Sequence, residues 1–132
     1  MHTFILQDWI TIQGSGSGAG ADVVQSKQDW LDLSAYQDVT FWLDVRDVGT
    51  VGGSAATVTL TFETSPTADD SLFQPMVAGT VLAAAVTPTI VKAPMYSASV
   101  PIGRFLRWRL DSSTANWVVT FRVLVAANSP GL

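Results

Sequence analysis

Residues 41–62, FWLDVRDVGTVGGSAATVTLTF, decide the fold, because two alternating segments flank a glycine-containing loop. The apolar members of the alternation are Val39, Phe41, Leu43 and Val45 in the first segment and Val58, Leu60 and Phe62 in the second. A period of two puts the apolar side chains of a strand on one face. The loop 49–54 contains three glycines, which take positive φ at little cost and let the chain reverse. The stretch therefore predicts a half-buried antiparallel hairpin to which the rest of the chain adds strands.

Further strand-like segments lie on both sides of this stretch. They cover residues 3–13, 23–25, 77–86, 89–93, 106–110 and 117–125, with turns or prolines between them. Residues 28–36 carry Trp30, Leu33 and Tyr36 at roughly helical spacing but are too few for an independent helix, so we interpret them as a turn that plugs one end of the fold. The pattern predicts an all-β, antiparallel β-sandwich or jelly roll of about seven to nine strands with no major helix.

The length of 132 residues predicts a single domain over 1–132. Residues 14–20, GSGSGAG, are expected to form a flexible loop, and residues 127–132 a short coil tail. The loop lacks the Gly-Lys-Ser/Thr ending of a phosphate-binding loop. The N-terminus lacks the basic start and apolar run of a signal peptide, and no apolar stretch approaches the ~20 residues that span a bilayer. We expect neither export nor a membrane partner.

Charge is scarce. Seven basic and eleven acidic residues give a net charge of −4, and no basic stripe is present for a nucleic-acid backbone, so we expect no nucleic-acid partner. Charged residues make up 14% of the chain, whereas about 25% is usual. Together with five tryptophans, this favours a surface partly covered by a partner or by further copies of the chain. A neutral surface rich in Ser, Thr and Gln is the alternative.

Nothing in the chain predicts an enzyme. Cysteine is absent and His2 is the only histidine, so a Ser/His/Asp triad would have to be built around the terminus. Oxygen ligands for calcium occur at Asp69–Asp70 and at Asp44 with Asp47, but neither pair fits an EF-hand loop. Solvated carboxylates in turns are the favoured interpretation, and we expect no cofactor and no metal.

Tryptophan placement gives the candidate interface. Trp42 falls on the polar face of its strand, so it lies either under a loop or exposed, where it would stack on a sugar ring or anchor a subunit contact. The other tryptophans are expected in or near the core. The interface candidates are Trp42, Trp9, Tyr96, Arg107 and Arg109.

Three segments, WLDLSAYQDV at 30–39, WLDV at 42–45 and LTFETSP at 60–66, followed by Asp69, Asp70 and Phe73, resemble a known pattern. It is similar to that of small β-sandwich proteins encoded among the head genes of tailed bacteriophages and prophages. The match spans about a third of the chain. The resemblance implies a virion component made in the host cytoplasm, a head decoration (cement) protein on the capsid surface. It further implies a homo-oligomer, with a trimer favoured, that contacts the major capsid protein and carries no cofactor.

Two other functions stay open at this point. A carbohydrate-binding jelly-roll module would use Trp42, Trp9 or Tyr96 as a stacking platform and would bind polysaccharide as a monomer. A phage tail or baseplate adaptor would share the virion context but attach to tail proteins.

Overall fold

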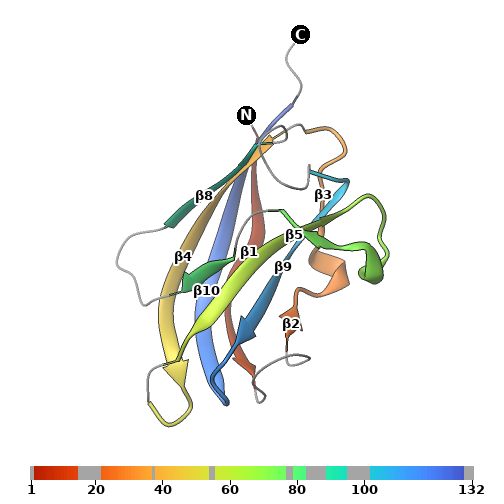
Figure 1. The fold of residues 1–132 in the computed structure, drawn as a ribbon. Coiled ribbons are helices and arrows are strands. Elements are labelled where there is room, and N and C mark those ends of the chain that lie inside the picture. The colour runs from red at the N-terminus through yellow and green to blue at the C-terminus, as the bar shows by residue number, and fades with distance from the viewer. Residues whose placement is uncertain are drawn as a thin grey trace.

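The computed structural model describes residues 2–14, 22–36, 38–53, 56–76, 79–82, 89–94 and 102–129, with the backbone alone for 89–94. These residues form two sheets that pack face to face (Figure 1). The four-stranded sheet has the order β1 (His2–Gly14), β10 (Trp117–Asn128), β4 (Asp38–Thr50), β8 (Thr89–Pro94). The six-stranded sheet has the order β2 (Val23–Val24), β9 (Phe105–Ser112), β5 (Val58–Ser65), β6 (Gln74–Pro75), with β3 (Leu31–Asp32) beside β9 and β7 (Thr80–Leu82) beside β5.

The predicted fold class is confirmed. Every strand pair is antiparallel. In the described part of the chain the helical segments are two three-residue 3-10 turns, η1 (Lys27–Asp29) and η2 (Asp70–Leu72). Within the described residues the strands number ten, slightly more than expected, because β2, β3, β6 and β7 are only two or three residues long and leave little alternation to detect.

The predicted hairpin over residues 41–62 is wrong. β4 pairs with β10 and β8, and β5 pairs with β9, β6 and β7, so the two strands lie in opposite sheets. Their apolar faces pack against each other across the core, where the rings of Phe41 and Phe62 stack with centroids 3.8 Å apart. The apolar faces of two strands are buried equally well when the strands face each other across the core and when they lie side by side in one sheet. Alternation alone therefore did not distinguish the two arrangements.

The last two strands cross the sandwich in the same way. β9 belongs to the six-stranded sheet and β10 to the four-stranded one, joined by a turn in which Asn116 takes a φ of 55°. Asn tolerates this left-handed conformation better than most residues. Trp108 and Phe121 meet edge to face at 5.2 Å between centroids. As predicted, β10 is buried at alternate positions, Trp117, Val119, Phe121, Val123 and Val125.

Element boundaries differ from expectation at a few positions. Gly14 ends β1 and is buried, so it is not part of a flexible loop, and Ala127 and Asn128 belong to β10 and not to a tail. The segment 28–36 plugs one end only in part. Leu33 is 1% exposed and Tyr36 packs against the Phe4 ring, whereas Trp30 lies over the outer side of the six-stranded sheet, as described below. The predicted strand 77–86 is described only at β7, and residues 15–21 and 130–132 lie outside the described residues.

Gly14 gives a test of the packing between β1 and β10. It faces Trp117, which is fully buried, and a Cβ built on Gly14 would overlap the indole ring. Gly14→Ala is therefore expected to lower the free energy of unfolding by about 1–3 kcal/mol, the usual cost of overpacking. Urea denaturation followed by tryptophan fluorescence measures it.

Gly52→Ala is the matched control, because a Cβ at Gly52 meets no atom within 4 Å. Equal stability of the two variants would contradict the packing described for Gly14 and Trp117.

Candidate functional site

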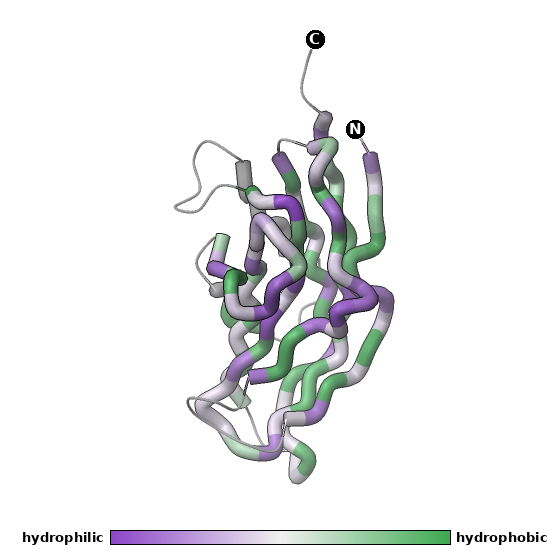
Figure 2. Tube along the Cα trace, turned by 90° about the vertical axis from the view of Figure 1, so that its right-hand side faces the viewer, coloured by the Kyte–Doolittle hydropathy of each residue, from purple (hydrophilic) through white to green (hydrophobic). Residues whose placement is uncertain are grey.

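The outer face of the four-stranded sheet carries an apolar row. The register pairs Ile5 with Leu124 and Leu124 with Trp42, so the three side chains lie on adjacent strands of one face. Each of the three stands at a position where the alternation of its strand predicts a polar residue. The residues on either side of Leu124 in β10 and of Trp42 in β4 are buried, whereas Leu124 and Trp42 are partly exposed and Ile5 is 62% exposed. Figure 2 views the sandwich from the side and shows no described segment outside this sheet. An exposed row of large apolar side chains on a bare sheet face is typical of an interaction surface.

Next to the row lies a cluster of tryptophan and arginine. Trp9 is 37% exposed, and the guanidinium groups of Arg46 and Arg122 lie 4.8 and 4.9 Å from its ring centroid. The Arg122 Nε donates to Asp44 Oδ2 at 3.0 Å, which fixes the arginine beside the ring. The cluster extends the surface with a partly neutralised cationic edge.

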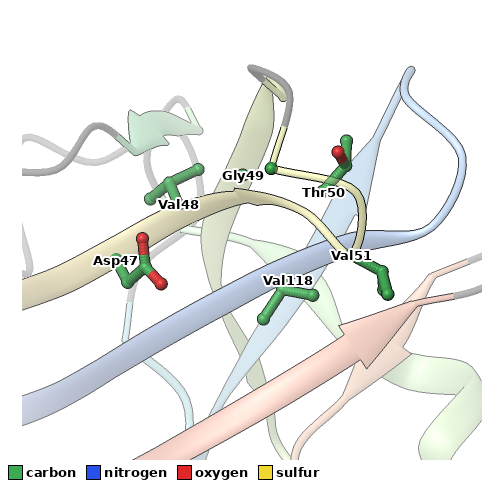
Figure 3. Close-up of a pocket in the computed structure, with 7 residues that line it drawn as sticks. Asp47, Val48, Gly49, Thr50, Val51 and Val118 are labelled. Carbon is green, nitrogen blue, oxygen red and sulfur yellow. The ribbon is translucent and has the colours of Figure 1, made fainter.

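Two shallow hollows flank these groups. One, of about 300 Å³, is lined by Thr3, Trp42, Leu124, Val125 and Ala126. The other, of about 540 Å³, lies where β4 curls toward the loop after it, beside β10 (Figure 3). Among the described residues that line it, Asp47 is the only charged one, and the others are Val48, Gly49, Thr50, Val51, Gly53 and Val118. Both hollows are open to the outside and mainly apolar or neutral, so they suit surface contact better than capture of a charged small molecule.

The outer face of the six-stranded sheet is built differently. Glu63 and Arg107 are cross-strand partners, 5% and 6% exposed, with Arg107 Nε donating to Glu63 Oε1 at 3.0 Å. Arg109 Nε forms an ion pair with Glu63 Oε2 at 3.2 Å, and its Nη1 donates to Asp22 Oδ2 at 2.9 Å. Arg107 Nη1 also donates to Asp70. Two arginines thus converge on the buried Glu63 carboxylate, and each of them also binds an aspartate, Asp70 or Asp22.

The chain itself covers this ion cluster. Phe73 and Trp30 lie 4.0 and 5.3 Å from the Arg107 guanidinium and contact each other edge to face at 4.6 Å. The carbonyl of buried Gln25 accepts from Trp30 Nε1, and its side-chain Nε2 donates to the Leu6 carbonyl of β1. η1 and η2 therefore lie on the same side of the six-stranded sheet (Figure 1). On the six-stranded sheet the chain itself covers the ion cluster between β5 and β9, while Val24 and Val81 at the sides of the sheet stay exposed. The outer face of the four-stranded sheet is not covered by any described segment.

The candidate residues fall into three groups. Trp42 and Trp9 both lie on the bare face, so the expectation of Trp9 in or near the core is wrong. Arg107 and Arg109 are on the covered face, where their guanidinium groups bind carboxylates of the same chain. Tyr96 lies outside the described residues.

Ile5 and Leu124 were missed as site residues. Their sequence signal was available, since each is a large apolar residue at a position where alternation predicts a polar one. A single such residue is common and carries little weight. Only the strand register shows that three of them share one row.

The carboxylates considered for calcium have other partners. Asp69 caps η2 by accepting from Ser71 N and Oγ, and Asp44 binds Arg122. Within the described residues no group of three or more His, Asp or Glu side chains is placed to hold a metal ion. No helix of the described chain is long and apolar enough to cross a membrane.

Two groups on the covered side have shifted pKa values. The Ser71 hydroxyl, and after it the Ser71 amide, lower the pKa of Asp69 below its ordinary 3.8. Burial lowers the pKa of Arg109, but the hydrogen bond to Asp22 and the charge of Glu63 outweigh it, so the net shift is upward. Arg109 is therefore a permanent cation beside Glu63.

Comparisons with known proteins identify no family. No protein-family model matches the chain, and no curated protein sequence matches it. Among solved structures, a family two carbohydrate esterase from Cellvibrio japonicus is similar over 99% of this chain, with 11% identity and a TM-score of 0.35. This chain covers 36% of that protein. A likeness this low carries no argument about function.

Arg107 is predicted to stabilise the fold strongly. Arg107→Met keeps the apolar stem but leaves buried Glu63 with Arg109 alone, and removing one partner of a buried ion pair costs about 3 kcal/mol. Urea denaturation measures the loss. Arg104→Met is the matched control, since the Arg104–Asp32 pair is largely exposed and exposed ion pairs contribute little to stability. A loss no larger than that of the control would contradict the buried cluster.

The Asp69 cap is predicted to be sensitive to Ser71. In the wild type, NMR titration should give Asp69 a pKa below 3.8, and Ser71→Ala should raise it toward 3.8 while leaving Asp32 unchanged. A lowered pKa adds stability above the ordinary value that is lost as pH falls through the folded-state value, so the variant should be less acid-sensitive in that window. No change at Asp69 would show that the Ser71 hydroxyl does not bind it in solution.

Proposed function

We propose that the protein is a structural component of a tailed-phage virion, a decoration protein that adheres to the capsid surface. The observation that carries the proposal is the difference between the two outer faces. The ion cluster over β5 and β9 is covered by Trp30 and Phe73, which follow η1 and η2, whereas the face of β1, β10 and β4 presents Ile5, Leu124 and Trp42. The resemblance over residues 30–73 supports the virion context.

Such a protein works by adhesion. Burying apolar side chains against a neighbour stabilises the contact by ~25 cal/mol per Å² before the costs of association are deducted. The sandwich itself supplies a stiff body, because the Phe41–Phe62 stack joins its sheets and the Arg107 cluster ties the cover to one of them. The partners in this proposal are further copies of the chain and the major capsid protein.

A carbohydrate-binding module is the second candidate. It is favoured by the partly exposed Trp42 beside a hollow of about 300 Å³ with Thr3 on its rim. A sugar platform needs free ring faces, however, and two guanidinium groups already lie against Trp9. Trp42 would have to serve alone among the described residues of that face, which favours the adhesive function over sugar binding.

The test is co-sedimentation of the wild-type protein with undecorated heads assembled from the major capsid protein of the same genome. Saturable binding at a fixed ratio to capsid subunits is expected, with heads that resist heat or chaotrope better once coated. Polysaccharides and purified tails are incubated in parallel. Binding to either of those, with none to heads, would overturn the decoration proposal and favour a carbohydrate module or a tail adaptor.

A further inference from the structure

We infer that two copies of the chain pack through the outer faces of their four-stranded sheets, related by a two-fold axis along the row Ile5–Leu124–Trp42. The inference rests on the proposed adhesive function and names its partner as a second copy of the chain. It differs from the trimer that the resemblance implies, because the face has a pattern that suits a pair.

Charge on this face favours a partner of the same kind. Arg46 and Arg122 share it with Asp38, Asp44 and Asp47. Arg122 is bound by Asp44 at 3.0 Å, and the Asp38 carboxylate accepts from Asn128. Mixed and partly paired charges give no strong attraction for a highly charged surface such as nucleic acid. A second copy brings the same mixture and the same apolar row.

Strand register then selects the axis. On one side of the apolar row the adjacent positions are Thr3, Ala126 and Thr40, which are uncharged, and Asp38 lies one row beyond them. On the other side lie Arg122 and Asp44, and Asp47 lies one row beyond them with Arg46 beside it in the bulge. Two facing sheets related by an axis that runs directly over β10 would place Arg122 against its own copy, and facing like charges are destabilising. An axis along the apolar row places Arg122 and Asp44 over uncharged side chains of the partner, and Asp38 over the partner's Arg46 and Asp47. Trp42, Leu124 and Ile5 then each face their own copies.

The area is sufficient for a specific contact. β1, β10 and β4 have 12 or 13 residues each. Three strands at about 4.8 Å spacing and about 3.3 Å per residue cover on the order of 550 Å². Two such faces bury roughly 1,100 Å², which passes the ~1,000 Å² expected of a weak but specific interface. We therefore expect a pair that dissociates on dilution.

The first measurement is solution mass by light scattering coupled to size exclusion across a concentration series. The wild type should approach twice the chain mass of 14.1 kDa at high concentration and fall toward 14.1 kDa on dilution. Leu124→Arg places two like charges at the axis and should leave a monomer with native circular dichroism. Val81→Arg, an exposed position on β7 of the other sheet opposite uncharged Thr59, is the matched control and should still pair. A stable trimer, a monomer at every concentration, or a paired Leu124→Arg variant would overturn the inference.

The second measurement fixes the geometry. The chain has no cysteine, so single cysteines report one position each. Leu124→Cys lies on the axis and should be joined to its copy by a short bis-maleimide. Thr11→Cys lies on the same face but four residues along β10 from Leu124, as the Thr11–Thr120 register shows, so its copy is about 27 Å away and should not react. Efficient linking at Thr11 with none at Leu124 would contradict the axis.

The two proposals can fail separately. Heads that bind a protein which stays monomeric would overturn the paired sheets and leave decoration intact. A protein that pairs as described but never binds heads would support the paired sheets and overturn decoration.

Discussion

The contact between Phe41 and Phe62 is the constraint on which the rest of the structure depends. Their rings stack 3.8 Å apart, one from β4 and one from β5, so two strands that follow each other in the chain must lie in opposite sheets. The same crossing recurs between β9 and β10, where Trp108 meets Phe121. Because each of these two connections links one sheet to the other, β4 forms its backbone hydrogen bonds with β10 and β8, and β5 forms its own with β9, β6 and β7. Each sheet therefore has one buried face and one outer face, and the function depends on the outer faces.

The outer faces have opposite characters for physical reasons. A buried carboxylate such as Glu63 is tolerated only with compensating charge, and Arg107 and Arg109 supply it from the neighbouring strand. Trp30 and Phe73 then lie against Arg107, so aromatic burial and charge pairing close that face together. On the other sheet, Ile5, Leu124 and Trp42 have no such cover from the described residues. Uncovered apolar area of this kind is stabilised by a partner, and the proposed functions follow from that difference.

Much of the fold follows from the sequence, because alternation identifies the buried side of each long strand. β10 and the inward residues of β9 were predicted correctly, whereas the pairing of β4 with β5 was not, because a period of two does not identify the neighbouring strand. Arg107 occupies an outward position and is still buried, since residues distant in sequence cover it. Trp9 was expected in or near the core, but it precedes Ile10, which pairs with buried Phe121, so the alternation of β1 puts Trp9 on the outer face against Arg46 and Arg122. Trp42 and Trp9 could be named as interface candidates from the sequence. The row Ile5–Leu124–Trp42 could be identified only from the strand register.

Oxidative footprinting with hydroxyl radicals, read by mass spectrometry at low and high protein concentration, tests most directly the central claim that one face is open and adhesive. Trp42 and Ile5 should react in dilute protein and become protected as concentration rises, while buried Trp108 and Trp117 stay protected throughout. Trp30, on the covered face, should react equally at both concentrations. Trp42 protected even in the most dilute sample would contradict the account, because the chain itself would then cover the face assigned to a partner.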